Sequence, residues 1–315
     1  MIITMNIEIK ENNVGKRVDS LLSEILKERS LTRNIVQRYL EKGCTVNSKE
    51  CKRSYKLKEG DILGIDEEYW DSVKNNLDLS KEILPQKGNL DIRYEDDNLM
   101  VLYKPKGLVV HPGVGNTDGT LANYLRYHLE SKNIYDTLMD RCGIVHRLDK
   151  GVSGLMVVAK NKENQEYLKT QFKNNLVIKI YRAELEESKN IEQNLDIKKY
   201  LKELNIELQP WKKWEKVEGY IGRSSKNRYK MEFRKYEFGG SKHALSYVKF
   251  FGNDALIKIE TGRMHQIRST LEYLGYYIKG DSLYGKNTKN SNNIMLESVL
   301  LSFEDINKKR LTFTV

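Results

Sequence analysis

Asp149 stands between two apolar runs, and its surroundings favour chemistry more than those of any other side chain. The apolar stretch that begins at Gly143 leads into it, and the turn sequence KGVSG at 150–154 leads out into the apolar run 155–159. This pattern predicts a short loop between two buried strands, with Asp149 held in a cleft by a rigid scaffold. A carboxylate placed there suits covalent attack on an anomeric carbon. The alternative is a turn or capping residue, which is the commoner use of an isolated Asp.

Two distant segments carry a tyrosine and an arginine whose roles the residues alone leave open. Tyr181 lies within a predicted strand over 177–185, where a tyrosine ring commonly packs in the core or across strands. Arg268 lies on a predicted helix over 264–273. A cation within about 4–6 Å of a carboxylate lowers its pKa by roughly 1–3 units, although the same Arg could also face solvent.

The sequences around these three residues together resemble the catalytic signature of the RluA/RluD-type pseudouridine synthases. The matching strings are G-I-V-H-R-L-D-K-G-V-S-G-L around Asp149, K-I-Y-R-A around Tyr181 and T-G-R-M-H-Q-I-R ending at Arg268. The resemblance implies that Asp149 is the catalytic nucleophile, that Tyr181 stacks on the target uracil and that Arg268 pairs with the catalytic Asp. Met264 departs from the family, which usually has Thr at this position.

The same resemblance implies further contacts with the substrate. Arg147 is expected to push aside or replace the flipped nucleotide, with a backbone-positioning contact as the alternative. Ile267 is expected to form an apolar floor under the base, and residues 280–285 fit the family's G-D-x-x-Y-G loop. The other residues expected around the base and along the RNA path are Lys104, Lys106, His111, His146 and Arg263.

The charge of the chain favours a polyanionic partner. There are 54 Lys and Arg against 44 Asp and Glu, a net charge of +10, and this excess attracts nucleic acid first and an anionic membrane surface second. No apolar run approaches the about 18 residues that span a bilayer, and the N-terminus lacks the pattern of a signal peptide. The expected partner is therefore RNA and not a membrane.

Cysteine and histidine usage favours neither a disulfide framework nor a metal site. The three cysteines form no C-x-x-C pair, and the five histidines lack H-x-x-x-H spacing. We therefore expect a cytoplasmic, reduced protein without metal or cofactor. We also expect a monomer that requires no protein partner.

A basic N-terminal block resembles the S4 RNA-binding domain. Amphipathic helices are predicted over 17–28 and 33–41, the second with Thr32 as its N-cap and Gly43 as its stop. A strand around 44–47 and the sequence Y-K-L-K-E-G-D at 55–61 follow, with Ser48 in place of the family's usual turn Gly. The alternative for this basic surface is an ordinary solvated helix face. The residues expected to contact RNA are Arg33, Arg38, Lys42, Lys49, Lys52 and Arg53.

The predicted elements indicate two domains. We expect a small α/β S4-like domain over 1–70, a linker over 71–89 within the polar stretch 66–89, and a catalytic domain over 90–315. Strands and helices of the catalytic domain lack regular βαβ alternation, which favours an α+β fold on a largely antiparallel sheet. The resemblance implies the pseudouridine synthase fold, a largely antiparallel mixed sheet flanked by helices and loops. The charged stretch 186–217 has helical potential, lies outside the resemblance and looks inserted.

The resemblance thus implies an RNA pseudouridine synthase acting on structured RNA, with large-subunit ribosomal RNA as the expected substrate and transfer RNA as the alternative. Two other functions stay open. One is a non-catalytic RNA-binding or ribosome-assembly protein, which the intact Asp149, Tyr181 and Arg268 argue against. The other is an RNA N-glycosylase that releases free base, which the lack of a second well-placed carboxylate argues against. The sequence does not distinguish addition of Asp149 to C1′ from a glycal route.

Overall fold

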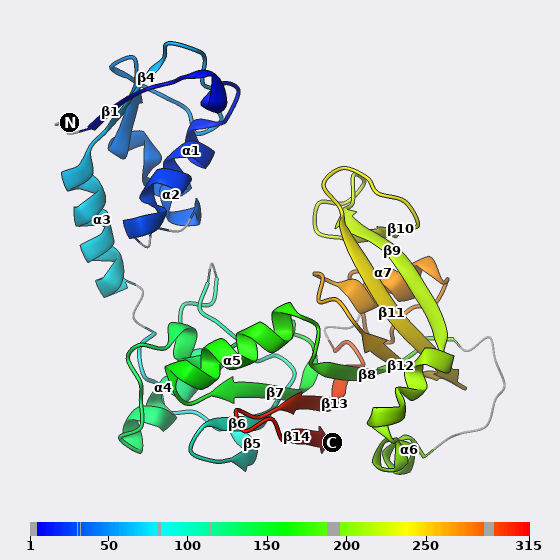
Figure 1. The fold of residues 1–315 in the computed structure, drawn as a ribbon. Coiled ribbons are helices and arrows are strands. Elements are labelled where there is room, and N and C mark those ends of the chain that lie inside the picture. Colours follow the sequence, from blue (N-terminus) through cyan, green and yellow to red (C-terminus); the bar gives the residue numbers. More distant parts are fainter. Residues whose placement is uncertain are drawn as a thin grey trace. The chain divides into compact units, whose positions relative to one another are not determined.

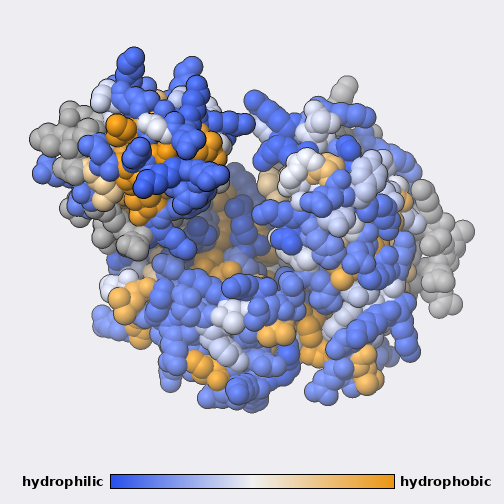
Figure 2. Space-filling model, turned by 45° about the horizontal axis from the view of Figure 1, so that its top comes forward, coloured by the Kyte–Doolittle hydropathy of each residue, from blue (hydrophilic) through white to orange (hydrophobic). Residues whose placement is uncertain are grey.

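The computed structural model describes residues 5–29, 31, 33–80, 83–113, 115–187, 196–286 and 293–315. The chain divides into two compact units, Met1–Glu82 and Ile83–Val315, and each is described by itself (Figure 1). Within the described residues no helix is long and apolar enough to cross a membrane. Hydrophilic residues dominate the surface visible in Figure 2.

The first unit packs helices against a small antiparallel sheet with strand order β1-β4-β2-β3. Its strands are β1 (Met5–Glu8), β2 (Cys44–Val46), β3 (Lys49–Glu50) and β4 (Ile62–Ile65). Its helices are α1 (Val18–Ile25), α2 (Arg33–Gly43) and α3 (Glu67–Ser80), with short 3-10 turns at Glu11–Asn13 and Leu26–Arg29. The two predicted helices and the strand near 44–47 are confirmed, while Thr32, the expected N-cap, lies outside the described residues.

Helix α3 corrects the expectation that residues 66–89 form a linker. Trp70 is fully buried and Val73 is 6% exposed, both in the hydrophobic core of the first unit. The indole of Trp70 lies against Gly43, where an added Cβ would come 2.5 Å from the ring, and its Nε1 donates a hydrogen bond of 2.8 Å to the Gly43 carbonyl. Gly43 therefore ends α2 with room for the ring, and α3 belongs to the first unit.

The turn between β2 and β3 holds two residues in left-handed backbone conformation. Asn47 has φ 52° and Ser48 has φ 62°. Positive φ at both central residues defines a type I′ hairpin turn, which matches the twist of the flanking strands. Asn adopts this conformation at little cost, but Ser lacks the conformational freedom of glycine.

The second unit is built on a ten-stranded sheet with the order β10-β9-β11-β12-β8-β13-β7-β6-β5, and β14 pairs with β13. Among the described strand pairs, β7 with β13 is parallel and the others are antiparallel. The first five strands are β5 (Asp91–Glu95), β6 (Leu99–Lys104), β7 (Ser153–Ala159), β8 (Ile178–Glu184) and β9 (Glu215–Arg223). The rest are β10 (Met231–Arg234), β11 (Lys242–Phe251), β12 (Asp254–Ile259), β13 (Leu296–Glu304) and β14 (Arg310–Thr314). The prediction of a largely antiparallel α+β fold is confirmed.

Helices and short turns cover parts of this sheet. The helices are α4 (Leu121–Ser131), α5 (Lys162–Lys173), α6 (Ile197–Glu203) and α7 (Gln266–Tyr273), with 3-10 turns at Asp140–Gly143, Ile206–Leu208 and Pro210–Lys213. Leu125 of α4 and Leu271 of α7 share one core cluster with Tyr181 of β8. Leu168 of α5 packs with Val157 of β7 in a second cluster (Figure 1).

The charged stretch 186–217 contributes to the fold more than its composition suggested. Residues 188–195 lie outside the described part, but α6 confirms the helical potential. Trp211 and Trp214 are 3% and 7% exposed and pack with Ile180 of β8 and Leu256 of β12. The sequence did not predict that its last residues begin β9, at Glu215. The residues of this stretch from 196 to 214 therefore form a packed layer on this part of the sheet.

The chain around Asp149 differs from the strand–loop–strand prediction. Residues 144–148 form no strand, and their backbone pairs with the sheet at one isolated bridge, between Ile144 and Val158. The strand that follows is β7, as expected. Gly154 has φ +120°, and an added Cβ would lie 2.4 Å from the backbone of Ser298 on β13. The glycine of the KGVSG turn thus permits the close approach of β7 to β13.

Candidate active site

Asp149 lies on the turn directly before β7. Its carbonyl accepts a hydrogen bond of 3.0 Å from the amide of Val152, which closes the turn. The neighbouring Leu148 and Val152 are each 4% exposed and belong to the core cluster that contains Tyr181. The carboxylate itself keeps 37% of its surface exposed. Buried neighbours therefore hold an accessible carboxylate, as a nucleophile requires.

Tyr181 lies within electrostatic range of this carboxylate. It lies on β8, opposite Ile257 of β12 and Ser298 of β13, and is 6% exposed. Burial raises the pKa of Tyr181, the charge of Asp149 raises it further, and a hydrogen bond with Ser298 acts in the opposite direction. The fold thus brings together two residues that are 32 positions apart in the sequence. The phenol stays protonated at neutral pH and keeps a hydroxyl group in the site.

Arg268 is held by Asp281 and not by Asp149, which corrects the expected direct pairing. Its Nε and Nη2 donate to Asp281 Oδ2 at 2.7 Å and Oδ1 at 2.6 Å. Burial alone lowers the pKa of the Arg268 guanidinium, but its bonds to Asp281, together with the nearby charge of Asp149, raise it overall. Arg268 is therefore a fixed cation within electrostatic range of the carboxylate.

His265 is the residue that sequence reasoning missed. It directly precedes α7, and its Nε2 lies 3.9 Å from Asp149 Oδ2. Its Nδ1 lies 3.0 Å from the hydroxyl of Tyr284. A signal was available, because His265 falls inside the T-G-R-M-H-Q-I-R string between two residues that were singled out. A sequence pattern does not show which of its side chains faces a distant carboxylate.

Lys104 is turned inward, which corrects the expectation that it lines the RNA path. It is fully buried. Its ammonium group donates to the carbonyls of Pro105 and Leu108, both at 2.9 Å, and of Lys150 at 3.4 Å. Burial lowers the pKa of Lys104 to about 8, against the opposing effect of Asp149. Its position fixes the backbone of the turn that carries Asp149.

His146 also points away from the substrate side, contrary to expectation. Its Nε2 accepts a 3.0 Å hydrogen bond from the Val157 amide, and its ring stacks on Phe172 of α5 at 4.6 Å. Burial, with a smaller contribution from Lys179, lowers the pKa of His146 to about 3. A neutral ring that accepts from β7 is a structural support.

The remaining substrate-binding candidates lie in three different settings. Arg147 is exposed, and its charge acts on half-buried His111, whose pKa falls to about 4 through burial, Arg141 and Arg147 in that order. Ile267 is 6% exposed in the core cluster of Tyr181. Arg263 donates from Nε to the His243 carbonyl at 2.7 Å. Arg141, which the sequence did not single out, thus joins Arg147 and His111 in a basic group.

The remaining predicted residues are Lys106, on the expected RNA path, and the basic residues of the first unit that are expected to contact RNA. Lys106 is half-buried and contacts the sulfur of Met295 at 3.0 Å. In the first unit Lys42, Lys49, Lys52 and Arg53 are exposed, as RNA contacts require, while the side chains of Arg33 and Arg38 lie outside the described part. No group of three or more His, Cys, Asp or Glu side chains that could hold a metal occurs in the described ranges.

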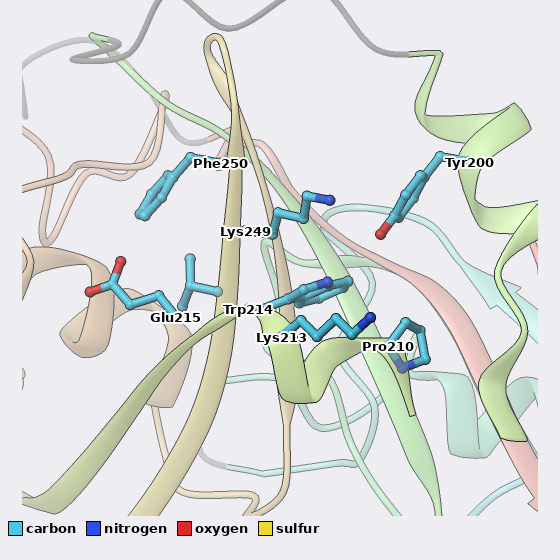
Figure 3. Close-up of a pocket in the computed structure, with 8 residues that line it drawn as sticks. Tyr200, Pro210, Lys213, Trp214, Glu215, Lys249 and Phe250 are labelled. Carbon is cyan, nitrogen blue, oxygen red and sulfur yellow. The ribbon is translucent and has the colours of Figure 1, made fainter. Parts of the chain in front are cut away.

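A cavity of about 430 Å³ lies apart from these residues. Figure 3 shows Tyr200, Pro210, Lys213 and Trp214 on one side of β11 and Phe250 on the other. Lys249 Nζ lies 5.1 Å from the centre of the Tyr200 ring. The lining contains none of the predicted catalytic residues, so this cavity is a separate feature of the packed layer over 196–214.

Sequence comparison defines the class of protein to which this fold and site belong. The family described as RNA pseudouridylate synthase matches residues 98–273, which include Asp149, Tyr181 and Arg268. The chain belongs to this family, and it is therefore an RNA pseudouridine synthase, an isomerase. This confirms the family and the kind of enzyme predicted from the sequence.

Curated relatives match nearly the whole chain. "Ribosomal large subunit pseudouridine synthase D" of Zymomonas mobilis is 30% identical over 98% of this chain and 89% of the relative. The protein of the same name from Yersinia pestis is 31% identical over 90% and 77%. An "Uncharacterized RNA pseudouridine synthase" of Chlorobaculum parvum is 35% identical over 89% of this chain and 79% of the relative.

Among solved structures, human RNA Pseudouridylate Synthase Domain Containing 1 has 22% identity and a TM-score of 0.51, covering 73% of this chain and 85% of that one. This likeness confirms the pseudouridine synthase fold.

Proposed function

We propose that this synthase modifies uridines of large-subunit ribosomal RNA, with Asp149 as the catalytic nucleophile. The observation that carries the proposal is the accessible Asp149 carboxylate, with buried Tyr181 and the fixed cation Arg268 within electrostatic range of it. The names of the relatives from Zymomonas mobilis and Yersinia pestis support ribosomal RNA as the substrate class. Transfer RNA is the alternative.

In the proposed reaction the target nucleotide is first extruded from its stack, which costs a few kcal/mol. Exposed Arg147 and the neighbouring Arg141 and His111 would offset this cost through contacts to phosphates and to the vacated position. Tyr181 would hold the uracil by stacking. These roles rest on the position of the basic group beside the turn that carries Asp149.

Asp149 would then start cleavage of the C1′–N1 bond, either by adding to C1′ or by taking a proton on a glycal route. The uracil rotates in the pocket, and C5 bonds to C1′ while the Asp149–C1′ bond breaks or, on the glycal route, while the proton taken by Asp149 returns to the sugar. The C5 proton then leaves to solvent, and N1 gains a proton. All other atoms of the uridine are retained, so the reaction balances without an oxidant, reductant or group carrier. We therefore propose an enzyme that works without a cofactor. We also propose that it works as a monomer, because the predicted catalytic residues all come from one unit of a single chain, and that it acts in the cytoplasm.

The test follows tritium from ribosomal RNA labelled at C5 of uridine. We expect tritium release by the wild-type enzyme, pseudouridine in the digested product, and no release by Asp149→Asn, because the amide cannot act as nucleophile or base. Tritium release by Asp149→Asn at the wild-type rate would refute the role of Asp149. Free uracil in place of pseudouridine would indicate a glycosylase, and absence of both products with bound RNA would indicate a binding protein.

A matched control and a substrate panel complete this experiment. Asp254→Asn changes a carboxylate on β12 that pairs with Arg182 of β8. Arg182 follows Tyr181, and successive residues of a strand point to opposite faces of the sheet, so this variant should leave tritium release unchanged. Labelled transfer RNA, offered beside ribosomal RNA at equal uridine concentration, tests the substrate class. Faster release from transfer RNA would overturn the ribosomal proposal and leave the isomerase activity intact.

A further inference from the structure

His265 has a strained backbone conformation beside the Asp149 carboxylate. It adopts φ 53° and ψ 25°, the left-handed region, directly before α7. A non-glycine residue is strained in this region, and such strain is typical of functional positions. The side chain is 11% exposed, and this conformation brings its Nε2 to 3.9 Å from Asp149 Oδ2.

Tyr284 fixes the tautomer of this imidazole. The Tyr284 hydroxyl accepts the amide hydrogen of Met231 at 2.7 Å and donates its single proton to the Met231 carbonyl at 3.0 Å. A phenol has one proton to give, so when Tyr284 gives it to the Met231 carbonyl, the His265 Nδ1 at 3.0 Å is the donor in the bond between them. In this arrangement the proton of neutral His265 sits on Nδ1, and its Nε2 presents a lone pair to Asp149.

We propose that His265 is a positioning residue for Asp149, held by Tyr284 with an unprotonated Nε2 toward the carboxylate, and that protonation of Nε2 withdraws Asp149 from the substrate. Two acceptors that face each other at 3.9 Å form no hydrogen bond, so neutral His265 limits the rotation of the carboxylate without occupying its lone pairs. A proton on Nε2 would turn the same contact into an ion pair. This inference rests on the proposed role of Asp149 as nucleophile.

Burial and the surrounding charges together lower the pKa of His265, so the imidazole is neutral near pH 7. Burial lowers the pKa of His265 first, and the charge of Arg268 on α7 lowers it further. Asp149 and Asp281 raise it, and Arg147 lowers it by a smaller amount. Tyr284, which faces Nδ1, is uncharged at this pH because burial raises its pKa. The pKa of His265 stays below its ordinary value, so withdrawal of Asp149 begins on the acid side of neutrality.

The variant His265→Asn tests this arrangement. Asn tolerates left-handed backbone, and its amide nitrogen can replace Nδ1 as the donor to Tyr284, while nothing replaces Nε2. We expect kcat for tritium release to fall about 10–100-fold, as for a displaced catalytic group, with KM within about twofold of wild type. We also expect the acid limb of the kcat profile to move to lower pH. His128→Gln, on α4 beside Glu95, is the matched control and should keep the wild-type profile.

The outcomes separate this inference from the proposed function. An inactive Asp149→Asn together with a His265→Asn enzyme of unchanged kcat and acid limb would overturn the role of His265 alone. An active Asp149→Asn would overturn the proposed nucleophile, whatever His265 does. If His265→Asn fails to fold, ¹⁵N chemical shifts of the wild-type histidines decide. A proton on Nδ1 of His265 at pH 7.5 supports the inference, and a proton on Nε2 refutes it.

Discussion

At the scale of single residues, the Arg268–Asp281 pair determines what the cation can do. The Asp281 carboxylate is fully buried. It accepts hydrogen bonds from Nε and Nη2 of Arg268 and from the amides of Leu283 and Tyr284. Burial acts to raise the pKa of Asp281, but these bonds outweigh it and hold the pKa below the usual range. The loop over 280–285 thereby anchors Arg268 through Asp281 and His265 through Tyr284, and so positions the imidazole that faces Asp149 and the cation within electrostatic range of it.

We predict that Asp281→Asn lowers the free energy of unfolding of the second unit by about 3–5 kcal/mol, the cost of leaving a buried charge without its partner. The pKa of Asp281 is lower in the folded protein than in the unfolded chain, where it is about 3.9. The stabilisation by Asp281 is therefore fully present above about pH 3.9, and it is lost as the pH falls through the folded-state pKa. Urea unfolding at pH 7 and pH 3 measures this: the difference between wild type and variant should shrink at pH 3.

Asp254→Asn is the matched control for this prediction. Asp254 also binds an Arg through two oxygens, at 2.8 and 3.1 Å, but Arg182 is 41% exposed and Asp254 is 24% exposed. Solvent screens such pairs, which are typically worth up to about 1 kcal/mol. Equal losses for the two variants at pH 7 would show that burial does not set the strength of the Arg268–Asp281 pair.

At the scale of elements, the hairpin β2–β3 carries a strain that one substitution removes. Ser48 occupies a left-handed position that favours glycine. We predict that Ser48→Gly raises the free energy of unfolding of the first unit by about 0.5–1 kcal/mol, because the relieved strain exceeds the extra entropy of an unfolded glycine. Hydrogen exchange of the Val46 and Leu63 amides on the paired strands β2 and β4 reports this stability.

Ser54 provides the comparison, because it is exposed and its φ is not positive. Ser54→Gly gains no relief of strain, and we expect no stabilisation or a small loss from the added unfolded entropy. Equal slowing of hydrogen exchange in the two variants would contradict the turn argument.

At the scale of the whole molecule, the two units have separate hydrophobic cores. The contribution of the first unit to RNA binding can therefore be tested by removing it. We predict that removal of residues 1–82 weakens RNA binding and makes its salt dependence shallower, since basic contacts to phosphate are lost. Binding measured by fluorescence anisotropy between about 0.05 and 0.2 M salt gives both quantities. The remaining unit should stay folded, as circular dichroism would show.

A charge variant of the full chain controls for the deletion. Replacing Lys42, Lys49, Lys52 and Arg53 by Gln removes four exposed charges from the first unit. If all four contact phosphate, the slope of log affinity against log salt should fall by about 3. Unchanged affinity at about 0.1–0.2 M salt in both proteins would show that this unit is not an RNA-binding module.

The sequence by itself determined the local elements, the family and the three residues of the predicted site. Helical and strand periodicity depends on near neighbours, and the strings around Asp149, Tyr181 and Arg268 are specific when taken together. The sequence did not predict that α3 belongs to the first unit, because most of its residues are polar. Its buried residues Trp70 and Val73 depend on contacts with α2 and Gly43, which the local pattern does not show. Only the tertiary structure decided the partners across the site. It paired Arg268 with Asp281, turned Lys104 and His146 inward, and placed His265 before Asp149, because such contacts follow from sheet order and loop packing between residues far apart in the chain.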